Sequence, residues 1–496
     1  LFLSMIQERA KVIASDAAAN RKFGWSVSID GDMMVVGAEG ASAAYVFTRN
    51  LASDWTQVDK LTPDVAVAEF GKSVSIDGDT IVVGAPGTAY VFTRNSPGDL
   101  TSTWSQSAQL LSPATGSFGM AVAIDGDTIA VGDTQAPRSN TGDPAEGAVY
   151  IFTRTGNLTS SWYRLPDNYG KISFFGTESD KGFGNSVAMY GNSVAIGATG
   201  HELSAYGNGI VGRAFVAYRT TPDDLNSAWT YLGYSSANSN RMIAGLRFGT
   251  SVSIDRDTMV IGAFGSGVRR YAEIWTRTSG CLSCGWTRRQ QLDLPGVVGD
   301  SQAGISVAVD GDTVVIGSHY DGDDSRGTAY VYRRDTPGDL ASGWTQHTKL
   351  TVSDGVEMDQ FGWSVAIDGS TVVIGALKDE DKASSVTDSG AVYVFELIFS
   401  PCDASIPPAN GAVGDCTSEL ESGSSCQPTC DAGYAASGPS TCEEGYLRPA
   451  FCTMYPQRAK LTGSYPGKNH YFGRGDMSID GDTIVVGVPY RSSGSA

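Results

Sequence analysis

A single phrase, close to F-G-x-S-V-x-I-D-G-D-T-x-V-V-G-A, recurs eight times along this chain of 496 residues. The copies begin at Phe23, Phe70, Phe118, Phe183, Phe248, Ala303, Phe361 and Phe472. A repeat of about 50–65 residues with turn chemistry inside each unit indicates a solenoid, a propeller or another array. The chain therefore consists of copies of one small unit, and neighbouring copies are expected to share a core.

The unit that begins at Phe70 predicts four strands. Ser73 to Ile76 alternates small polar and apolar residues, which is the period of a strand. Asp77-Gly78 is a strong hairpin signal between two apolar runs. Three further strands are expected at Ile81 to Val83, Ala89 to Thr93 and Trp104 to Leu111. Four antiparallel strands in sequential order form one blade of a β-propeller.

An aromatic residue opens the fourth strand of each unit. These residues are Trp55, Trp104, Trp162, Trp229, Trp286 and Trp344, with Tyr455 in the seventh unit. We interpret them as packing residues rather than as ligand-stacking residues. The high glycine content, the short strands and the lack of helical periodicity all favour an all-β fold.

The two ends of the chain look like complementary halves of one unit. Seven full units run from Phe23 to about Leu461, and the eighth has only its first two strands, Met477 to Val488. The start, Leu1 to Ser4, reads as a third strand, and Gln7 to Val12 resembles the expected fourth strand at Gln457 to Leu461. We favour an eight-bladed ring closed by both termini, because closure removes exposed strand edges. The alternatives are seven blades plus an extra partial blade, self-association through the termini of different chains, and a segment of a longer tandem protein.

Residues 401–453 differ from the repeats and hold six of the eight cysteines. We predict a propeller over residues 1–400, a disulfide-rich insert over 401–453, and a return to the propeller over 454–496. A small, cysteine-dense module is typical of an oxidising compartment, and its pairing is not determined by spacing alone. Cys281 and Cys284, in a loop of the fifth unit, are expected to form a local disulfide rather than a zinc site, since no second cysteine pair or nearby histidine is present.

The repeats resemble FG-GAP repeats, which form the propeller head of integrin α chains. The insert resembles a sushi (complement control protein) module through Cys402, the run Pro408 to Gly411, the run Cys430 to Tyr434, Gly438, Cys442 and Cys452. That resemblance implies the pairs Cys402–Cys442 and Cys430–Cys452, with the extra cysteines Cys416 and Cys426 paired to each other.

The hairpins depart from the calcium-binding blades of integrins. Their turn is only Asp-Gly-Asp-Thr. It offers too few carboxylates to supply the six to eight oxygen ligands that calcium takes. We expect no cofactor, and we read these aspartates as turn formers. Weak candidates for a cation site lie in two longer acidic loops, at Asp321, Asp323, Asp324, Asp379 and Asp381.

Composition narrows the class of protein. With 35 basic and 54 acidic residues the net charge is −19, which disfavours nucleic-acid binding. No apolar stretch is long enough to span a membrane. With the cysteine-rich module, this favours an extracellular, secreted or cell-surface protein, either a mature segment or part of a longer chain. Asn157-Leu158-Thr159 is an expected N-glycosylation site, and Arg474-Gly475-Asp476 is interpreted as a coincidental RGD triplet because it opens an inner strand.

No catalytic constellation stands out in the sequence, so we expect a protein that is not an enzyme. The leading hypothesis is an extracellular structural or adhesion glycoprotein module that contacts proteins or glycans, with a subunit of a cell-surface coat or filament as a special case. The alternative is a secreted lyase or hydrolase acting on polysaccharides through the central face of the propeller. A cluster of carboxylates or of Tyr and His side chains on that face would favour the enzyme.

Overall fold

The computed structural model describes residues 5–50, 54–112, 117–137, 147–173, 180–203, 209–235, 246–264, 271–294, 302–321, 325–352, 354–379, 387–398, 401–421, 424–443, 445–454, 477–480 and 483–486. The chain divides into two compact units, Leu1–Ser400 and Pro401–Ala496, each described by itself.

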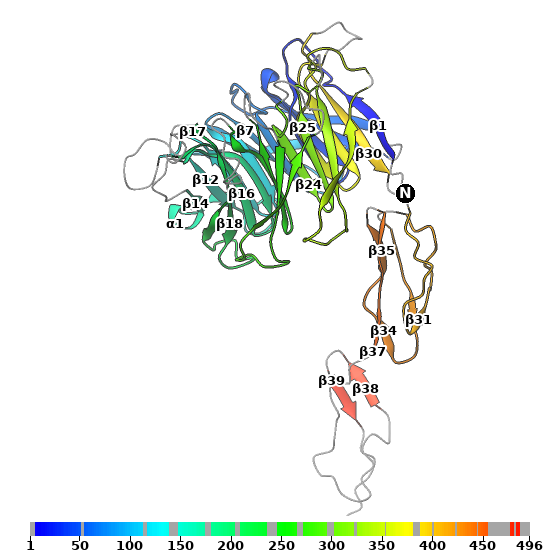
Figure 1. Cartoon of the computed structure of the whole chain (residues 1–496). Helices are drawn as coiled ribbons and strands as arrows, with labels where there is room; N and C mark the ends of the chain where they lie inside the picture. Colours follow the sequence, from blue (N-terminus) through cyan, green and yellow to red (C-terminus); the bar gives the residue numbers. More distant parts are fainter. Residues whose placement is uncertain are drawn as a thin grey trace, which may run out of the picture. The chain divides into compact units, whose positions relative to one another are not determined.

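The first unit is a ring of seven antiparallel sheets, which we number as blades 1 to 7 (Figure 1). From the channel outward the strands are β2 (Phe23–Asp30), β3 (Met33–Ala38), β4 (Ala43–Arg49) and β5 (Trp55–Leu61) in blade 1; β6 (Ser73–Asp77), β7 (Thr80–Ala85), β8 (Thr88–Arg94) and β9 (Trp104–Leu111) in blade 2; β10 (Phe118–Asp125), β11 (Thr128–Asp133), β12 (Ala148–Thr153) and β13 (Tyr163–Arg164) in blade 3; β15 (Asp180–Tyr190), β16 (Ser193–Leu203), β18 (Arg213–Arg219) and β19 (Trp229–Ser235) in blade 4; β20 (Phe248–Asp255), β21 (Thr258–Ala263), β22 (Tyr271–Thr276) and β23 (Thr287–Asp293) in blade 5; β24 (Ser306–Asp310), β25 (Thr313–Ser318), β26 (Thr328–Arg334) and β27 (Trp344–Leu350) in blade 6; and β28 (Phe361–Asp368), β29 (Thr371–Ala376), β30 (Ala391–Ile398) and β1 (Met5–Val12) in blade 7.

Short elements decorate this ring. Among the described residues these are η1 (Glu39–Ala41), α1 (Asp167–Gly170), β14 (Lys171–Ile172), which pairs with β12, and β17 (Gly209–Ile210), which pairs with β16. The all-β propeller expected from the repeats is therefore confirmed, with blades that follow the predicted strand order.

The N-terminal strand corrects the favoured blade count. β1 pairs antiparallel with β30, with Gln7 opposite Glu396 and Val12 opposite Val392, so it is the outermost strand of blade 7. Inner strand β2 packs against β28, which closes the ring after seven blades. The eight-bladed ring, in which residues 1–14 complete the last unit, is thus wrong for the described residues. The seven-bladed alternative fits, and the strand expected at Gln457 to Leu461 lies outside them.

β1 takes this position because it carries what an outer strand of this ring needs. Ile6 packs on the core between blades 6 and 7, and Val12 is buried between blades 7 and 1. Lys11 Nζ forms ion pairs of 2.8 and 2.7 Å with the carboxylates of Asp354 and Asp379. An edge strand that supplies both apolar contacts and a paired cation removes the unpaired edge of β30.

The repeated motif fastens each blade to the next. Ser26 Oγ donates to the carbonyl of Gly71 in the following blade at 3.0 Å, and Ser364 Oγ donates to that of Gly24 at 2.8 Å across the ring closure. Gly37 lies so close to this contact that an added Cβ would lie 2.1 Å from the Gly71 oxygen. Glycine is therefore required where the strands approach, which explains the V-V-G-A part of the phrase.

Seven apolar clusters fill the spaces between neighbouring blades. In the cluster between blades 1 and 2, Phe70 packs edge-on against Tyr90 and Phe92, with ring centroids 5.5 and 6.0 Å apart. Each blade thus contributes one side to two cores, and stability comes from burial between blades rather than inside one.

The second unit contains small sheets held by disulfides. Its described strands are β31 (Gly411–Ala412), β32 (Ser425–Cys426), β33 (Thr429–Cys430), β34 (Tyr434–Ala436), β35 (Ser440–Glu443), β36 (Tyr446–Arg448), β37 (Cys452–Met454), β38 (Met477–Asp480) and β39 (Thr483–Val486). Disulfides join Cys402 to Cys442, Cys416 to Cys426 and Cys430 to Cys452. These are the pairs implied by the sushi resemblance, which itself stays a prediction. The strand pair β38–β39 forms the predicted hairpin.

No helix in the described part of the chain is long and apolar enough to cross a membrane.

Candidate functional site

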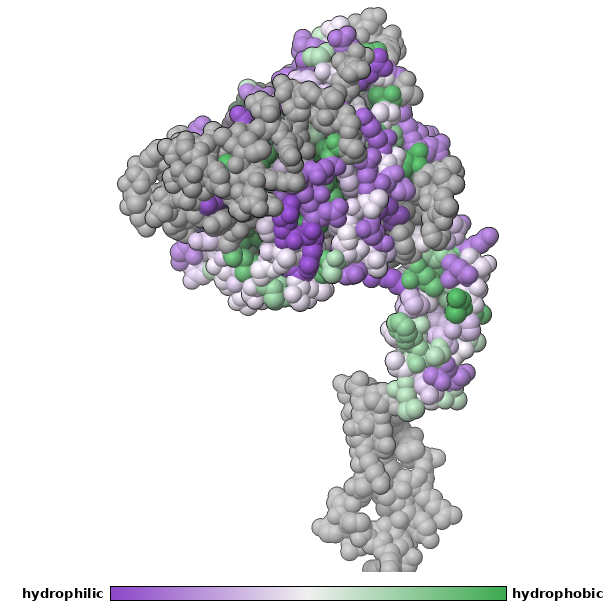
Figure 2. All heavy atoms as spheres, in the orientation of Figure 1, coloured by the Kyte–Doolittle hydropathy of each residue, from purple (hydrophilic) through white to green (hydrophobic). Residues whose placement is uncertain are grey.

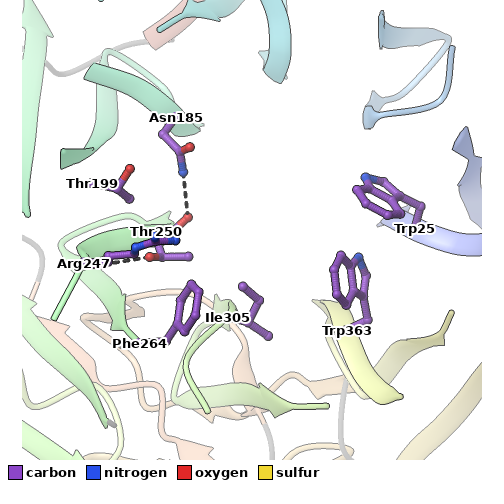
Figure 3. A pocket seen from close by; sticks show the side chains of 8 residues that line it. All are labelled: Trp25, Asn185, Thr199, Arg247, Thr250, Phe264, Ile305 and Trp363. Atoms are coloured by element: carbon purple, nitrogen blue, oxygen red, sulfur yellow. Dashed lines mark hydrogen bonds between the residues drawn. The ribbon is translucent and has the colours of Figure 1, made fainter. Parts of the chain in front are cut away.

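The residue that follows each Phe-Gly, or Ala-Gly in blade 6, stands at the start of an inner strand, around one mouth of the central channel. In ring order these residues are Trp25, Lys72, Met120, Asn185, Thr250, Ile305 and Trp363. Five of the seven line a cavity of about 370 Å³, together with Thr199, Arg247 and Phe264. We call this the channel-mouth cavity; Figure 3 shows its lining side chains around a shared space.

One wall of the channel-mouth cavity is polar and comes from blades 4 and 5. Asn185 Nδ2 donates to the carbonyl of Thr250 at 3.3 Å, and Thr250 Oγ1 donates to the carbonyl of Arg247 at 2.7 Å (Figure 3). Thr199 lies beside them. These bonds fix the backbone while leaving amide, hydroxyl and guanidinium groups at the cavity.

The rest of the lining is apolar and aromatic, with Phe264 beside Arg247 and the two tryptophans across the cavity. It consists of Phe264 and Ile305 from blades 5 and 6, with Trp363 and Trp25 from blades 7 and 1 (Figure 3). The Trp25 and Trp363 rings contact each other, with centroids 4.9 Å apart and planes tilted by 50°. A concave site with one apolar wall and a few placed polar groups is typical of small-ligand pockets.

Two lysines cover Trp25 and are neutralised locally. Lys22 Nζ and Lys72 Nζ lie 4.8 and 4.4 Å from the centre of the Trp25 ring. Both pair with the buried carboxylate of Glu39, at 3.4 and 2.9 Å, and Lys72 also pairs with Glu69 at 3.1 Å. Their charge therefore holds the indole in place rather than facing the cavity unpaired.

The lining offers several kinds of ligand-binding group. Its eight described side chains include no carboxylate, histidine or cysteine. Carboxylates, histidines and cysteines are common general acids, bases and nucleophiles, and lysine, tyrosine, serine and threonine can also take these roles. The arrangement can hold a ligand by hydrogen bonds, by one cation and by aromatic contact.

His319 lies behind the aromatic wall. Its ring is 4.8 Å from that of Trp363 and 4.3 Å from that of Tyr320, and the residue is fully buried. Neither ring nitrogen has a hydrogen-bond partner among the described residues. Burial lowers the pKa of His319 to about 4, so the imidazole is neutral near pH 7.

The candidate metal residues Asp321 and Asp379 are buried and engaged. Asp321 Oδ2 accepts hydrogen bonds from Tyr330 Oη at 2.6 Å and Thr328 Oγ1 at 2.7 Å, and pairs with Lys349 Nζ at 3.0 Å. Burial works to raise the pKa of Asp321, but these three donors together hold it below its usual range. Asp323, Asp324 and Asp381 lie outside the described residues.

Asp379 repeats this arrangement in blade 7. Its Oδ2 accepts from Tyr393 Oη at 2.5 Å, and its Oδ1 pairs with Lys11 of the closing strand at 2.7 Å. Burial, with the carboxylates of Asp379 and Asp354, raises the pKa of Tyr393. Both carboxylates join an outer-strand lysine to a third-strand tyrosine, which is a packing role; a cation at these loops stays a prediction.

The hairpin aspartates line the other end of the inner strands. In six blades the Asp that opens the hairpin turn accepts the backbone N–H of the turn glycine in the next blade. Examples are Asp30 with Gly78, and Asp368 of an Asp-Gly-Ser turn with Gly31, both at 2.6 Å. Burial and neighbouring carboxylates raise the pKa of Asp77. These aspartates shape the turns, as expected, and also tie neighbouring blades together.

The fourth-strand tryptophans stack on arginines of the third strand in six blades. The pairs are Arg49–Trp55, Arg94–Trp104, Arg154–Trp162, Arg219–Trp229, Arg277–Trp286 and Arg334–Trp344, with 4.5–5.8 Å between guanidinium carbon and ring centre. In five of them the arginine also pairs with the second Asp of its own hairpin. The tryptophans thus stack on arginines of their own blades and pack at the apolar clusters between blades, and none of them lines the channel-mouth cavity.

The remaining predicted sites are on outer loops or outside the described residues. Asn157 is exposed, and its Oδ1 accepts from Thr159 N and Oγ1 at 3.1 and 2.7 Å. Asp99 makes the same turn with Thr101 in blade 2, so Asn157 also has a structural role, and its glycosylation stays a prediction. Cys281 and Cys284 form a disulfide. The RGD triplet lies outside the described residues.

Sequence reasoning missed the channel-mouth cavity, although a signal for it exists. The third residue of the phrase F-G-x-S is the variable position between repeated neighbours, and the ring brings these positions together. Residues that vary inside an otherwise repeated motif are the natural place for binding specificity.

A known protein family shares the repeat. The family model described as "FG-GAP repeat" matches residues 6–47, 55–96, 104–152, 243–270, 286–332 and 344–395, slightly more than half of the chain. The first match runs from β1 to β4, so the family unit begins on the outer strand of one blade and ends in the next. A crystal structure of a protein from Lactobacillus plantarum superposes with a TM-score of 0.46 at 13% identity, covering 70% of this chain and 88% of that one. No curated protein matches the sequence.

Proposed function

The chain belongs to the FG-GAP repeat family, and from this premise we propose that it is an extracellular structural or adhesion glycoprotein module that binds other proteins or glycans. Propellers of this family serve mainly as scaffolds for interaction. The four disulfides are consistent with an oxidising, extracellular location. A subunit of a coat or filament remains a special case of this proposal.

The channel-mouth cavity is the single observation that carries the proposal. Its lining comes from five blades and largely from the variable repeat position, whereas the rest of the motif is occupied by contacts between blades. Figure 2 shows that the described propeller surface in that view is mainly hydrophilic, with apolar residues scattered singly. On that face the described residues form no broad apolar docking surface.

Binding is tested with the whole chain on a panel of polysaccharides. Affinity electrophoresis through gels that contain pectin, alginate, cellulose derivatives or glycol chitin is expected to retard the chain in at least one gel. Thr250→Trp fills the cavity and should abolish retardation, whereas Thr56→Trp, on the exposed face of β5, should not. Equal retardation of both variants would contradict the proposed site.

The same panel tests the alternative, a secreted polysaccharide lyase or hydrolase. Such an enzyme would release new reducing ends or unsaturated sugar products on prolonged incubation. The absence of a carboxylate or histidine from the described lining supports binding without turnover. Product release that Thr250→Trp abolishes would overturn the binding proposal in favour of the enzyme.

A further inference from the structure

Arg247 is a cation at the cavity without a local counter-charge. It belongs to a repeated position, directly before Phe-Gly, where the side chain projects beside the channel mouth. Lys22 and Glu69 occupy this position in blades 1 and 2, and each forms an ion pair, at 3.4 Å with Glu39 and 3.1 Å with Lys72. Arg247 is exposed, and no carboxylate of the described residues lies within ion-pair distance of it.

The backbone holds Arg247 against the cavity. Its φ is 48°, in the left-handed region, and its carbonyl accepts the Thr250 hydroxyl at 2.7 Å. Its guanidinium carbon lies 5.7 Å from the centre of the Phe264 ring. A planar guanidinium lying against an aromatic ring is restrained, so binding an anion there costs little further side-chain entropy.

The groups around Arg247 match a sugar ring. Thr199, Thr250 and Asn185 offer hydroxyl and amide groups to sugar hydroxyls, while Phe264, Ile305 and Trp363 offer an apolar wall to the C–H bonds of one ring face (Figure 3). A volume of about 370 Å³ lies at the small end of the range for ligand pockets, about 300–1,000 Å³, and suits one sugar unit rather than a long oligomer.

We propose that the channel-mouth cavity binds a carboxylated sugar unit, with the Arg247 guanidinium holding the carboxylate by two parallel hydrogen bonds. This inference rests on the proposed function and names its ligand class, a uronic acid at the end or branch of a glycan. Guanidinium–carboxylate pairs combine charge with planar geometry, and a neutral sugar lacks both.

The test is calorimetry of the whole chain with three probes: D-glucuronic acid, methyl glucoside and sodium acetate. The first carries the ring and the carboxylate, and each of the others carries one of the two. D-glucuronic acid is expected to bind about 10- to 100-fold more tightly than either, since a charge-assisted hydrogen bond contributes about 1.5–3 kcal/mol. Equal affinity for D-glucuronic acid and methyl glucoside would overturn the role of the carboxylate.

Variants identify the residues responsible. Arg247→Ala should weaken D-glucuronic acid binding to the level of methyl glucoside, whereas Arg9→Ala, at an exposed residue of β1, changes the net charge equally and should leave binding unchanged. Trp363→Leu should weaken both ring-containing probes and leave acetate unaffected. Thermal melts of each variant confirm that the ring is intact. An unchanged affinity in folded Arg247→Ala would contradict the inference.

Failure of this inference and failure of the proposed function give different results. If the polysaccharide panel retards the chain only with neutral polymers, and Thr250→Trp still abolishes retardation, the binding site stands and the acidic ligand is wrong. If D-glucuronic acid does not bind and no polymer retards the chain, both fail.

Discussion

At the residue scale, the burial of His319 couples the stability of the propeller to pH. Its folded pKa is about 4, against an unfolded value of 6.5, so protonation favours the unfolded chain. The contribution of neutral His319 to the free energy of unfolding is fully present above pH 6.5. About 3 kcal/mol of it is lost as the pH falls toward 4.

His319→Leu keeps an apolar side chain of similar size in this buried place and removes the titration. We expect the stability difference between variant and parent to grow in favour of the variant as the pH falls from 7.5 to 4.5. Urea unfolding at several pH values measures it. Two curves that stay parallel over this range would show that His319 is not held neutral in the folded chain.

A second residue-scale prediction concerns the buried arginines of the third strands. Arg334 pairs with Asp312, donates to Thr258 Oγ1 of the preceding blade at 2.9 Å, and lies 4.5 Å from the centre of the Trp344 ring. Arg334→Ala leaves the Asp312 carboxylate, with 12% of its side chain exposed, without its cation. We expect a loss of about 3–5 kcal/mol in the free energy of unfolding.

Arg334→Lys separates charge from geometry at this position. Lysine keeps the charge but cannot reproduce the fork to Asp312 and Thr258, so an intermediate loss is expected. The exposed Arg9→Ala is the matched control and should change stability by less than about 0.5 kcal/mol. Chemical denaturation of the four chains compares them. Equal denaturation midpoints for Arg334→Ala and Arg9→Ala would contradict a stabilising role for Arg334.

At the scale of elements, β1 closes the blade that lacks this arginine. Where blade 6 has Asp312, Arg334 and Trp344, blade 7 has Ser370, Leu397 and Ile6. The closing strand is therefore held by apolar contacts and by the ion pairs of Lys11. A cysteine pair at Gln7 and Glu396, which lie opposite each other in the register, would test where this strand belongs.

We expect Gln7→Cys/Glu396→Cys to oxidise within one chain. Partners across an antiparallel pair lie about 4.5–5.5 Å apart at Cα, within the range that a disulfide spans. The described cysteines are all paired already, so new bonds report on the new residues. Non-reducing electrophoresis should show a monomer, with the two single variants as controls. A ladder of covalent oligomers would instead mean that β1 closes a neighbouring ring, as in a filament.

The closure also shows where prediction from sequence stopped. The strands, the Asp-Gly turns and the all-β repeat followed from Phe70 to Leu111 alone, because local patterning determines them. The choice of closing strand did not, since Gln7 to Val12 and Gln457 to Leu461 carry almost the same outer-strand pattern. In the described residues Gln7 to Val12 takes this place, with Ile6 and Val12 packed on the cores and Lys11 ion-paired. Gln457 to Leu461 lies outside the described residues. The cavity was missed because its residues, such as Trp25 and Asn185, meet only when the ring closes.

The Asp-Gly-Asp hairpins support a prediction about metal dependence. Their first aspartates accept backbone N–H groups of the next blade, and several of the second pair with arginines. A carboxylate satisfied in this way needs no cation for folding. Excess EDTA is expected to leave the melting temperature of the propeller nearly unchanged, and added calcium should not raise it. A fall of many degrees would reveal a structural ion at these turns or at the loops of Asp321 and Asp379.

At the scale of the whole molecule, the two units rest on different sources of stability. The propeller is held by apolar burial between seven blades, and its described residues contain one disulfide, Cys281–Cys284, which encloses a very short loop. Among its described residues, the second unit has one small apolar cluster, made largely of cysteines. Such a module lacks the core that would stabilise it without covalent links.

Reduction of the disulfides should therefore destabilise the second unit much more than the propeller. The three disulfides of the second unit close loops of 10, 22 and 40 residues, and loop closure of this length contributes about 3–4 kcal/mol each, comparable to the stability of a small module. The single propeller disulfide contributes about 1.5 kcal/mol at most. We expect calorimetry to show a large and a small transition, with dithiothreitol removing the small one and shifting the large one slightly. Peptide mapping without reduction should recover the four pairs. Loss of the large transition on reduction would contradict the conclusion that apolar burial stabilises the propeller. Free thiols within residues 402–452 would contradict the disulfides and the oxidising compartment that the cysteines indicate.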